Sequence, residues 1–437
     1  MNRNPQLLSG AVAPSPARAG DHLAIHQLLL QVFRGPSVLE FVAQQEEPGY
    51  SPKLRQVFRE GSRILGHIRL VPSMMKHSAG TLLPVARLCD FAVQEDFRGR
   101  GLGTLLLAAA EKQAAEMGLA MLVARSDRAP FFERNQWFPL GHHLYSQAGP
   151  REILAELDRR WQQRRLTSSQ LPRKPLPEVS VRRWKQTEHA ALQRLYRDGI
   201  DGIPGPLARS DSHWRWLIGR EAYDWLYLAV EGPDHTSFDP IQAHIVGYMF
   251  VKGNRIVEIV TATKREDAAR ALLTRACHDA MEQDTIPLLR LDAPADHSFH
   301  SLFSAAGGQF VRRECEANQW RLAKVIDWQR LAAATLPASF HESLVMEILL
   351  PDSSPRWLIV EEGNVRYESD RSPAAARASI ACSAITVAQL LLGHCSLAEA
   401  TANNAIQFHH RSAAAALEKW LPAHPLWQPP LEELPAG

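Results

Sequence analysis

The sequence predicts an α/β (α+β) protein of three successive domains, and three observations support this. The chain has 437 residues, enough for two to four domains of ordinary size. Residues 22–150 alternate strand-like and helix-like patterns, and residues 179–330 partly repeat that order after a proline-rich segment. From about residue 336 the pattern changes to paired strands followed by helices, which indicates a smaller third domain.

In the first domain, two strands precede a glycine-rich turn and a helix. We expect the strands at residues 62–71 and 82–93 and the helix at 104–116, because Gly118 follows where a helix commonly ends. A short buried strand is expected next, at 119–124.

The second domain repeats this order without the glycines. Helices are expected at 189–196 and 266–281, and the strands at 245–251, 256–260 and 287–291. The turn at 261–265 contains no glycine, so this copy is not expected to hold a pyrophosphate as the first copy would.

The third domain should pair strands 343–350 and 356–362 and continue with helices at 386–392 and 412–420. The predicted division of the chain is a disordered N-terminus at 1–20, a first domain at 21–160, a linker at 161–178, a second domain at 179–330 and a third at 331–437.

Composition excludes several classes of protein. The chain carries 49 basic and 47 acidic residues, so no overall field attracts nucleic acid or an anionic membrane. Its five cysteines are scattered and include no C-x-x-C pair, which predicts neither disulfides nor a metal site and fits the cytoplasm. No signal peptide and no apolar run long enough to cross a bilayer is predicted, so no membrane partner is expected either.

A glycine-rich turn between strand and helix is the strongest chemical signal. Residues 98–103, Arg-Gly-Arg-Gly-Leu-Gly, can point backbone N–H groups at a pyrophosphate beside the positive end of a helix dipole. The spacing fits neither the Rossmann fingerprint nor a P-loop. A tight turn that binds no ligand is the structural alternative.

Two motifs in order resemble the GNAT acetyltransferases. The run from Leu88 to Gly103 resembles the family's acetyl-coenzyme A motif, in which a strand ending in valine precedes Arg/Gln-x-x-Gly-x-Gly/Ala. Residues 129–138 resemble the short helix and turn that close the GNAT core. The whole arrangement, an active GNAT domain, a degenerate copy and a sterol-carrier-protein-like domain, resembles the tripartite Eis (enhanced intracellular survival) acetyltransferases.

This resemblance implies an N-acetyltransferase that takes acetyl-coenzyme A as acyl donor and a primary amine as acceptor, aminoglycoside-like or lysine-like, and that forms a homo-oligomer. It also implies which residues bind the coenzyme. Backbone N–H groups near Phe91, Ala92 and Val93 would bind the pantetheine arm. The loop that would bind the pyrophosphate consists of Arg98, Gly99, Arg100, Gly101, Leu102, Gly103 and Thr104.

Acetyl transfer to an amine requires a neutral amine, and several groups are candidates for the base. In water, an ammonium group with a pKa near 10.4 costs about 4.6 kcal/mol to deprotonate at pH 7. Asp90 is one candidate, although pairing with Arg69 or Arg87 is the structural alternative. The resemblance to Eis implies another, the terminal carboxylate at Gly437. Three histidines are further candidates, each more often structural: His67, His142 and His143.

Phe132 departs from the family pattern. GNAT enzymes usually have a tyrosine at the matching position, and its hydroxyl protonates the departing thiolate. Phe132 cannot donate a proton, so water, Ser126 or Tyr145 would have to substitute. The alternative function is therefore a coenzyme A-binding or scaffolding protein with weakened chemistry, whose third domain carries lipid by analogy of fold.

Overall fold

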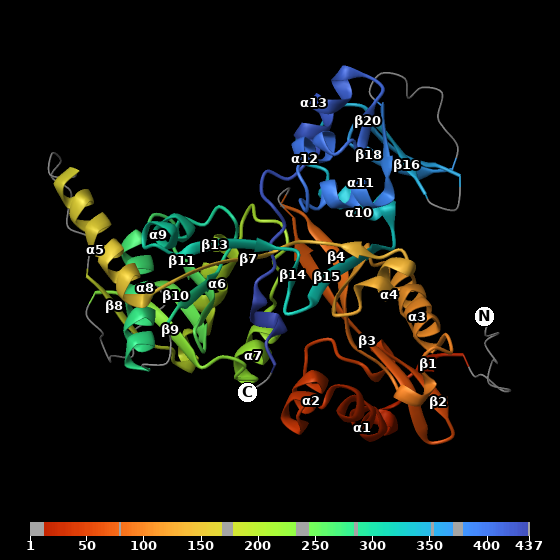
Figure 1. Ribbon diagram of the computed structural model, residues 1–437, viewed down its shortest axis with the longest axis horizontal. Coiled ribbons are helices and arrows are strands. Elements are labelled where there is room, and N and C mark those ends of the chain that lie inside the picture. The colour runs from red at the N-terminus through yellow and green to blue at the C-terminus, as the bar shows by residue number, and fades with distance from the viewer. Residues whose placement is uncertain are drawn as a thin grey trace. The chain divides into compact units, whose positions relative to one another are not determined.

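Three mixed sheets and their helices form an α+β protein (Figure 1). This computed structural model describes residues 13–77, 80–167, 178–232, 244–283, 287–350, 354–369 and 379–435. The chain divides into two compact units: residues 1–142 with 314–426, and residues 143–313 with 427–437. None of the described helices is long and apolar enough to cross a membrane.

The first sheet belongs to the first unit. Its strands, in spatial order, are β1 (Ser15–Pro16), β2 (Arg55–Glu60), β3 (Arg63–Lys76), β4 (Leu82–Val93), β5 (Met121–Ser126), β15 (Gln319–Val325) and β14 (Cys315–Glu316), with β6 (Phe138–Pro139) paired to β15. The strands predicted at 62–71, 82–93 and 119–124 are thus confirmed as β3, β4 and β5.

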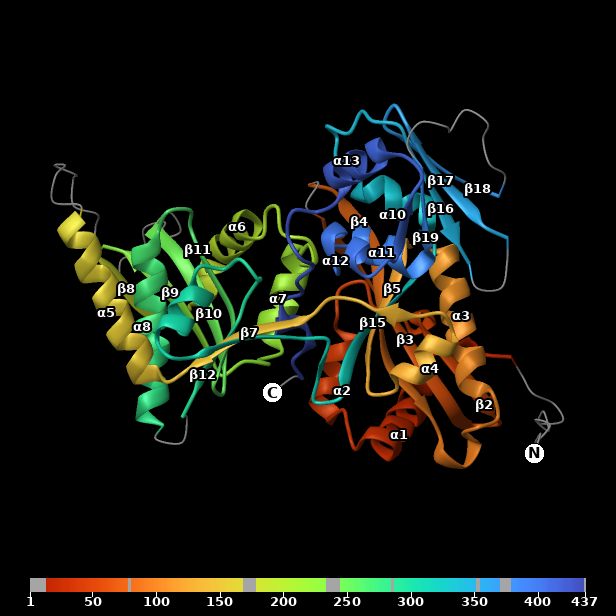
Figure 2. The ribbon, with the colours of Figure 1, turned by 45° about the horizontal axis from the view of Figure 1, so that its top comes forward.

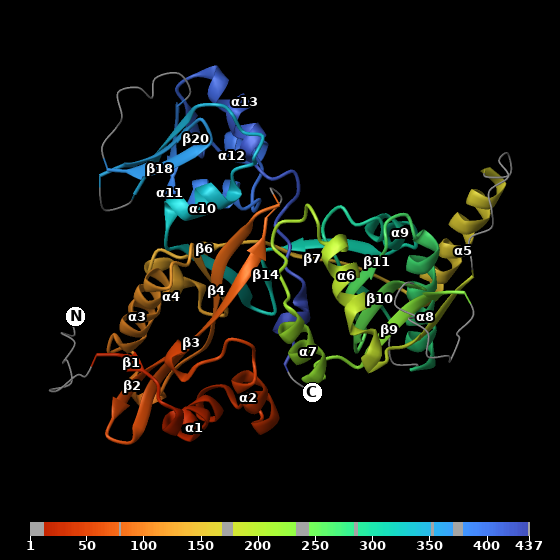
Figure 3. The same cartoon turned by 180° about the vertical axis from the view of Figure 1, so that it is seen from behind.

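Helices cover both faces of this sheet (Figure 3). On one face lie α1 (His22–Phe33) and α2 (Val38–Gln45), which pack on a cluster that includes Val57 and Ala92. On the other lie α3 (Leu102–Glu116) and α4 (Ala129–Arg134), which share a core with β3, β4 and β5. The predicted helix at 104–116 is confirmed as α3, and the predicted short helix after residue 129 as α4.

The second unit is built on a seven-stranded sheet. In spatial order its strands are β13 (Gln309–Arg313), β7 (His143–Ala148), β12 (Leu289–Asp292), β11 (Arg255–Thr261), β10 (Ile245–Lys252), β9 (Trp225–Glu231) and β8 (Val179–Arg183). Its helices are α5 (Pro150–Thr167), α6 (His189–Gly199), α7 (Asp211–Gly219), α8 (Glu266–Glu282) and α9 (Phe299–Ala305). The helices predicted at 189–196 and 266–281 are confirmed as α6 and α8.

A five-stranded sheet with helices on one face completes the first unit (Figure 2). Its strands are β18 (Asn364–Glu368), β17 (Arg356–Glu361), β16 (Leu344–Leu349), β19 (Ser379–Ser383) and β20 (Ile406–Phe408); its helices are α10 (Trp328–Thr335), α11 (Ala384–Leu391), α12 (Leu397–Ala402) and α13 (Arg411–Trp420). The predicted pairing of 343–350 with 356–362 is confirmed by the antiparallel register of β16 and β17.

Two strands are exchanged between the first two sheets. The expected boundaries place β7 in the first domain and β15 in the second, whereas β7 pairs with β12 and β13, and β15 pairs with β5 and β6. Strand pairing of this kind depends on residues far apart in the chain, so local patterns do not encode it. The expected linker at 161–178 begins inside α5, and its residues 168–177 lie outside the described part of the chain.

Residues 13–20 differ from the disorder expected for 1–20. Ser15 and Pro16 form β1 on Val57 and Gln56 of β2. The guanidinium of Arg59 holds this segment, because it donates to the Ser15 hydroxyl at 2.6 Å and pairs with Asp21. Residues 1–12 lie outside the described part of the chain.

The C-terminal segment is anchored to the second unit by a buried arginine. The side chain of Arg209 is fully buried and donates to both oxygens of Glu258, at 2.8 and 2.6 Å, and to Glu432 at 2.6 Å. Its guanidinium lies over the rings of Tyr196, at 3.9 Å, and Trp214, at 4.7 Å. A charge this buried is tolerated only with such partners, so the ion pair fixes the short 3-10 helix at Pro430–Glu433.

Candidate functional site

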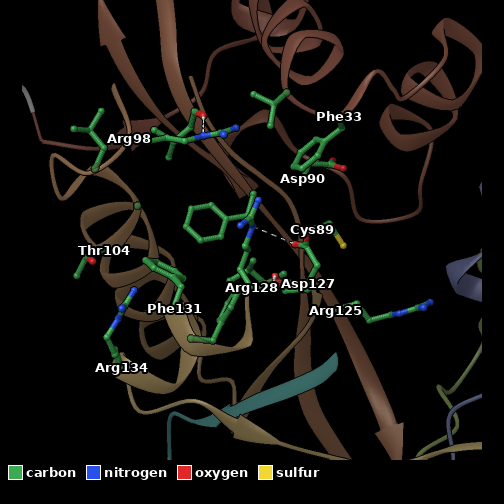
Figure 4. Close-up of a pocket in the computed structure, with 18 of the residues that line it drawn as sticks. Phe33, Cys89, Asp90, Arg98, Thr104, Arg125, Asp127, Arg128, Phe131 and Arg134 are labelled. Atoms are coloured by element: carbon green, nitrogen blue, oxygen red, sulfur yellow. Dashed lines mark hydrogen bonds and ion pairs between the residues drawn. The ribbon is translucent and has the colours of Figure 1, made fainter. Parts of the chain in front are cut away.

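The described part of the first unit contains a cavity of about 900 Å³ where β4 and β5 diverge (Figure 4). The parallel pairing of these strands covers only Val85–Leu88 of β4 and Met121–Ala124 of β5, although both strands continue further. Beyond that point, Cys89–Phe91 and Arg125–Ser126 line the opening between them. The site therefore lies where the sheet splits.

A bulge at Asp90 produces this divergence. Between β3 and β4 the register shifts, so that His67 faces Ala92 but Arg69 faces Cys89. Asp90 takes a left-handed conformation with φ of 52°, which is uncommon for residues other than glycine. Such a bulge re-aims the strand and frees its backbone groups from regular pairing.

His67 holds the bulge from within the sheet. Its Nδ1 lies 2.8 Å from the carbonyl oxygen of Asp90, and its Nε2 lies 3.1 Å from Nη1 of Arg55. Because a carbonyl only accepts and a guanidinium only donates, the imidazole is neutral with its proton on Nδ1. Burial and the neighbouring charge of Arg55 lower the pKa of His67 to about 3.

Two arginines neutralise the Asp90 carboxylate. Nε of Arg69 donates to Oδ2 of Asp90 at 3.0 Å, and Nη1 of Arg55 lies 3.6 Å from the same oxygen. Burial raises the pKa of the Asp90 carboxyl, but the charges of Arg69 and Arg55 outweigh burial and hold this pKa below its usual value. An ammonium ion, whose pKa is near 10.4 in water, would not readily give its proton to a carboxylate whose pKa lies below the usual value. The pairing with Arg69 thus favours a structural role for Asp90 over that of a base.

A wider network of buried polar groups supports these arginines. Arg55 donates to the Tyr50 hydroxyl at 3.1 Å and to the Gln44 amide oxygen at 3.0 Å. Glu47 accepts from Arg69 at 3.1 Å and from Arg87 at 2.8 Å. Local patterns do not single out Arg55, Glu47 or Tyr50, because only the folded chain brings β2 and the segment after α2 to the bulge.

The predicted pyrophosphate loop lies along the cavity. Gly99 and Gly101 have φ of 75° and 83°, in the left-handed region that glycine adopts without steric cost. Gly101 is the N-cap of α3 and has no side chain to cap it, so the first N–H groups of the helix are available to an anion. The first turn of α3 also contains no acidic residue.

Most of the predicted coenzyme residues line the cavity, and the others flank it. The lining includes Phe91, Val93, Arg98, Gly99, Gly101, Leu102, Gly103 and Thr104. Arg98 donates from Nε to the carbonyl of Val93 at 3.1 Å, which ties the loop to the end of β4. Ala92 is buried against α1 and α2, and the guanidinium of Arg100 lies 5.0 Å from the ring centre of Phe97.

The remaining predicted catalytic residues lie in different places. Phe132 lines the cavity and is buried, with edge-to-face contacts to Phe131 and Trp137 at ring distances of 5.4 and 5.1 Å. Ser126 also lines the cavity. Tyr145 and His143 lie in β7, in the sheet of the second unit, and Gly437 lies outside the described residues.

His142 lies in a cluster with Glu314 and His394 whose donor atoms are within 4.8 Å of one another, a spacing compatible with a metal ion. However, Nδ1 of His394 accepts the N–H of Gly141 at 2.9 Å, which puts the proton of the neutral ring on Nε2. The His142 and His394 rings are also stacked, 4.6 Å apart. In this conformation His394 offers no lone pair to a metal.

Similarity to known families assigns the class of protein. Residues 24–136 match the model of the acetyltransferase (GNAT) family, a span that contains the bulge, the glycine loop and α4. The first domain therefore matches the GNAT acetyltransferase family, and that family implies acetyl-coenzyme A as the donor. This confirms the predicted resemblance to GNAT enzymes.

Solved structures match nearly the whole chain. Eis1 from Mycobacterium abscessus aligns with a TM-score of 0.65 and 14% identity, over 95% of this chain and 99% of that one. A probable N-acyltransferase from Enterococcus faecalis V583 aligns at 0.71 and 12%, over 94% and 97%. A GCN5-related N-acetyltransferase from Kribbella flavida aligns at 0.68 and 14%, over 95% and 96%. At these identities the likeness shows the fold, and no curated protein matches the sequence.

We predict that Gly101→Asp weakens coenzyme A binding at least a hundred-fold relative to Gly101→Asn. Both side chains tolerate a left-handed conformation and both enter open space, since nothing lies within 4 Å of a Cβ at this position. The two variants thus differ mainly in the negative charge placed beside the pyrophosphate. Calorimetric titration with coenzyme A measures the difference; equal affinities would show that the loop does not bind the pyrophosphate.

We also predict a pH-dependent stability that depends on His67. The pKa of His67 is about 3 in the folded chain and near 6.5 when unfolded. The contribution of neutral His67 to the free energy of unfolding is therefore complete above pH 6.5 and is lost as the pH falls toward 3. Between pH 7 and pH 5 the loss is about 2 kcal/mol. His67→Gln keeps a donor and an acceptor but does not titrate, so it should lack this loss.

Hydrogen exchange of the β4 amides, corrected for the intrinsic rate at each pH, measures that contribution locally. The other buried histidines are unchanged in the variant and serve as the internal control. An equal loss in wild type and variant would contradict the buried, neutral state of His67.

Proposed function

We propose that this chain transfers an acetyl group from acetyl-coenzyme A to a primary amine by direct attack in a ternary complex. The observation that carries the proposal is the opening between β4 and β5, which combines the bulge at Asp90 with an uncapped helix N-terminus in one cavity. Backbone N–H groups near Phe91 to Val93 would bind the pantetheine arm and polarise the thioester. The loop from Arg98 to Thr104 would bind the pyrophosphate.

A protein that only binds the coenzyme is the second candidate. It is favoured by Phe132, which has no hydroxyl, and by Asp90, whose carboxylate is already paired with arginines. A thiolate with a pKa near 8.5 is nevertheless a good leaving group, so transfer does not depend on a positioned acid.

Thiol release from acetyl-coenzyme A distinguishes the two functions. We expect release that depends on added primary amine, together with coenzyme binding that Gly101→Asp abolishes in parallel. Coenzyme binding without any turnover over a panel of primary amines would establish the binding protein instead.

We predict that Phe132→Tyr raises kcat about ten-fold or more on any accepted amine, with little change in coenzyme affinity. The added hydroxyl would act only as the thiolate departs, which is the signature of an effect confined to the transition state. The same hydroxyl in Phe131→Tyr, on the neighbouring ring of the cavity, should give no such gain. An unchanged kcat in well-folded Phe132→Tyr would place the acid elsewhere.

The terminal carboxylate at Gly437 stays a proposed base, and the residues before it are anchored in the second unit. Leu431 and Leu434 are buried in the core of the second unit, and Glu432 is bound by Arg209. Deletion of Pro435–Gly437 leaves these anchors in place, and we expect it to leave most activity. Loss of turnover with folding and coenzyme binding preserved would give the carboxylate a catalytic role.

We further propose that the second unit is a degenerate GNAT domain and that the domain predicted at 331–437 is sterol-carrier-protein-like, without residues 427–437, which belong to the second unit. The matching turn of the second unit, between β11 and α8, lines a cavity of only about 200 Å³. Asp267 in the first turn of α8 already supplies a negative charge there, bound by Arg265 at 2.7 Å. The five-stranded sheet with helices on one face supports the second assignment. A homo-oligomer stays a prediction.

A further inference from the structure

Charged side chains around the cavity bear on which amines it can accept. Among the described residues that line it, the carboxylates are Asp90 and Asp127, and the arginines are Arg98, Arg125, Arg128 and Arg134. Nε of Arg128 lies 3.7 Å from Asp127 Oδ1, and Asp90 is paired with Arg69. An acceptor with several ammonium groups would therefore meet more positive than negative charge.

The charges behind Asp90 reinforce this balance. Arg55, Arg69 and Arg87 lie next to the carboxylates of Asp90 and Glu47. All of these side chains are buried or nearly so, with at most 17% of each exposed, and salt in the solvent screens such groups weakly. Both carboxylates among the described lining residues, those of Asp90 and Asp127, thus already have an arginine partner, so neither is available to a second ammonium group.

We take the part of the cavity lined by Val32, Phe33, Cys89 and Arg125 as its acceptor end, and apolar side chains lie there. Val32 and Phe33, at the end of α1, are part of the lining, and 54% of Phe33 is exposed. Phe33, Cys89 and Arg125 lie apart from Arg98, Thr104 and Arg134, which flank the coenzyme loop (Figure 4). An aromatic ring bound beside Phe33 would remove apolar surface from water on both partners.

We propose that the acceptor is a primary monoamine with an apolar, preferably aromatic, body and no second cationic group. This rests on the proposed acetyl transfer and narrows it, because it disfavours the aminoglycoside-like acceptors that the resemblance to Eis implies. The same surroundings favour the neutral amine, since nearby positive charge and apolar contacts both penalise an ammonium ion. The chemistry then depends less on a side-chain base.

A matched pair of amines tests the charge argument. The pair is 2-phenylethylamine, a monocation, and 4-(aminomethyl)phenethylamine, a dication that carries one more ammonium group on the same body. With saturating acetyl-coenzyme A and wild-type protein, we expect kcat/KM to be at least ten-fold lower for the dication. Calorimetric binding of both amines to the coenzyme A-loaded protein should show the same order without requiring turnover.

Variants test the apolar argument. Phe33→Ala should lower kcat/KM for 2-phenylethylamine about ten-fold while leaving that for ethylamine within two-fold, because ethylamine is too short to cover the ring. Leu39→Ala is the matched control, since Leu39 lies on α2, is 70% exposed and does not line the cavity. Phe33→Glu adds a carboxylate to the site, so it should reduce or reverse the difference in kcat/KM between the monocation and the dication.

The outcomes separate this inference from the proposed function. Turnover that is equal or faster with the dication, or with spermidine, would overturn the acceptor class while leaving acetyl transfer intact. Binding of the coenzyme with no amine turned over or bound would overturn the proposed function, and the acceptor class with it. Equal effects of Phe33→Ala and Leu39→Ala on 2-phenylethylamine would remove Phe33 from the acceptor site.

Discussion

The left-handed backbone at Asp90 is the constraint on which the candidate site depends. A residue other than glycine adopts this conformation at a cost of about 1 kcal/mol or more, so it needs support from its surroundings. His67 supplies a hydrogen bond to the Asp90 carbonyl, and Arg69 and Arg55 hold the carboxylate. With the bulge in place, β4 leaves β5 after four paired residues, and the cavity, its backbone donors and its acceptor end all follow from that divergence.

The structure also explains why two similar halves of the chain differ in their cavities. The loop before α3 contains two glycines with positive φ, and no acid occupies the first turn of the helix. The loop before α8 has Lys264 in a left-handed conformation, and Asp267, paired with Arg265, places a negative charge in the first turn of the helix. The same order of strand, turn and helix therefore leaves the first turn of one helix without an acidic side chain and places Glu266 and Asp267 in the first turn of the other.

Local features of the site could be predicted from sequence, and long-range ones could not. Strands β3 and β4, helix α3 and the glycine turn follow from periodicity and from the residue types that terminate helices, so they were identified. Arg55 carries no local signal of function, because an arginine in a strand has many ordinary roles. Gln319 lines the cavity at the start of β15, and no pattern near it indicates that β15 pairs with the distant strand β5.

The exchange of β7 and β15 has a consequence for how the chain folds during synthesis. The first sheet cannot be completed until β15 has left the ribosome, after almost all of the second unit has been made. The nascent first half would expose the edge of β5 during that time, and an unpaired edge strand readily joins another chain. Pairing between strands so far apart in the chain slows folding. Because each unit contains two separate segments of the chain, one cut cannot separate the two units.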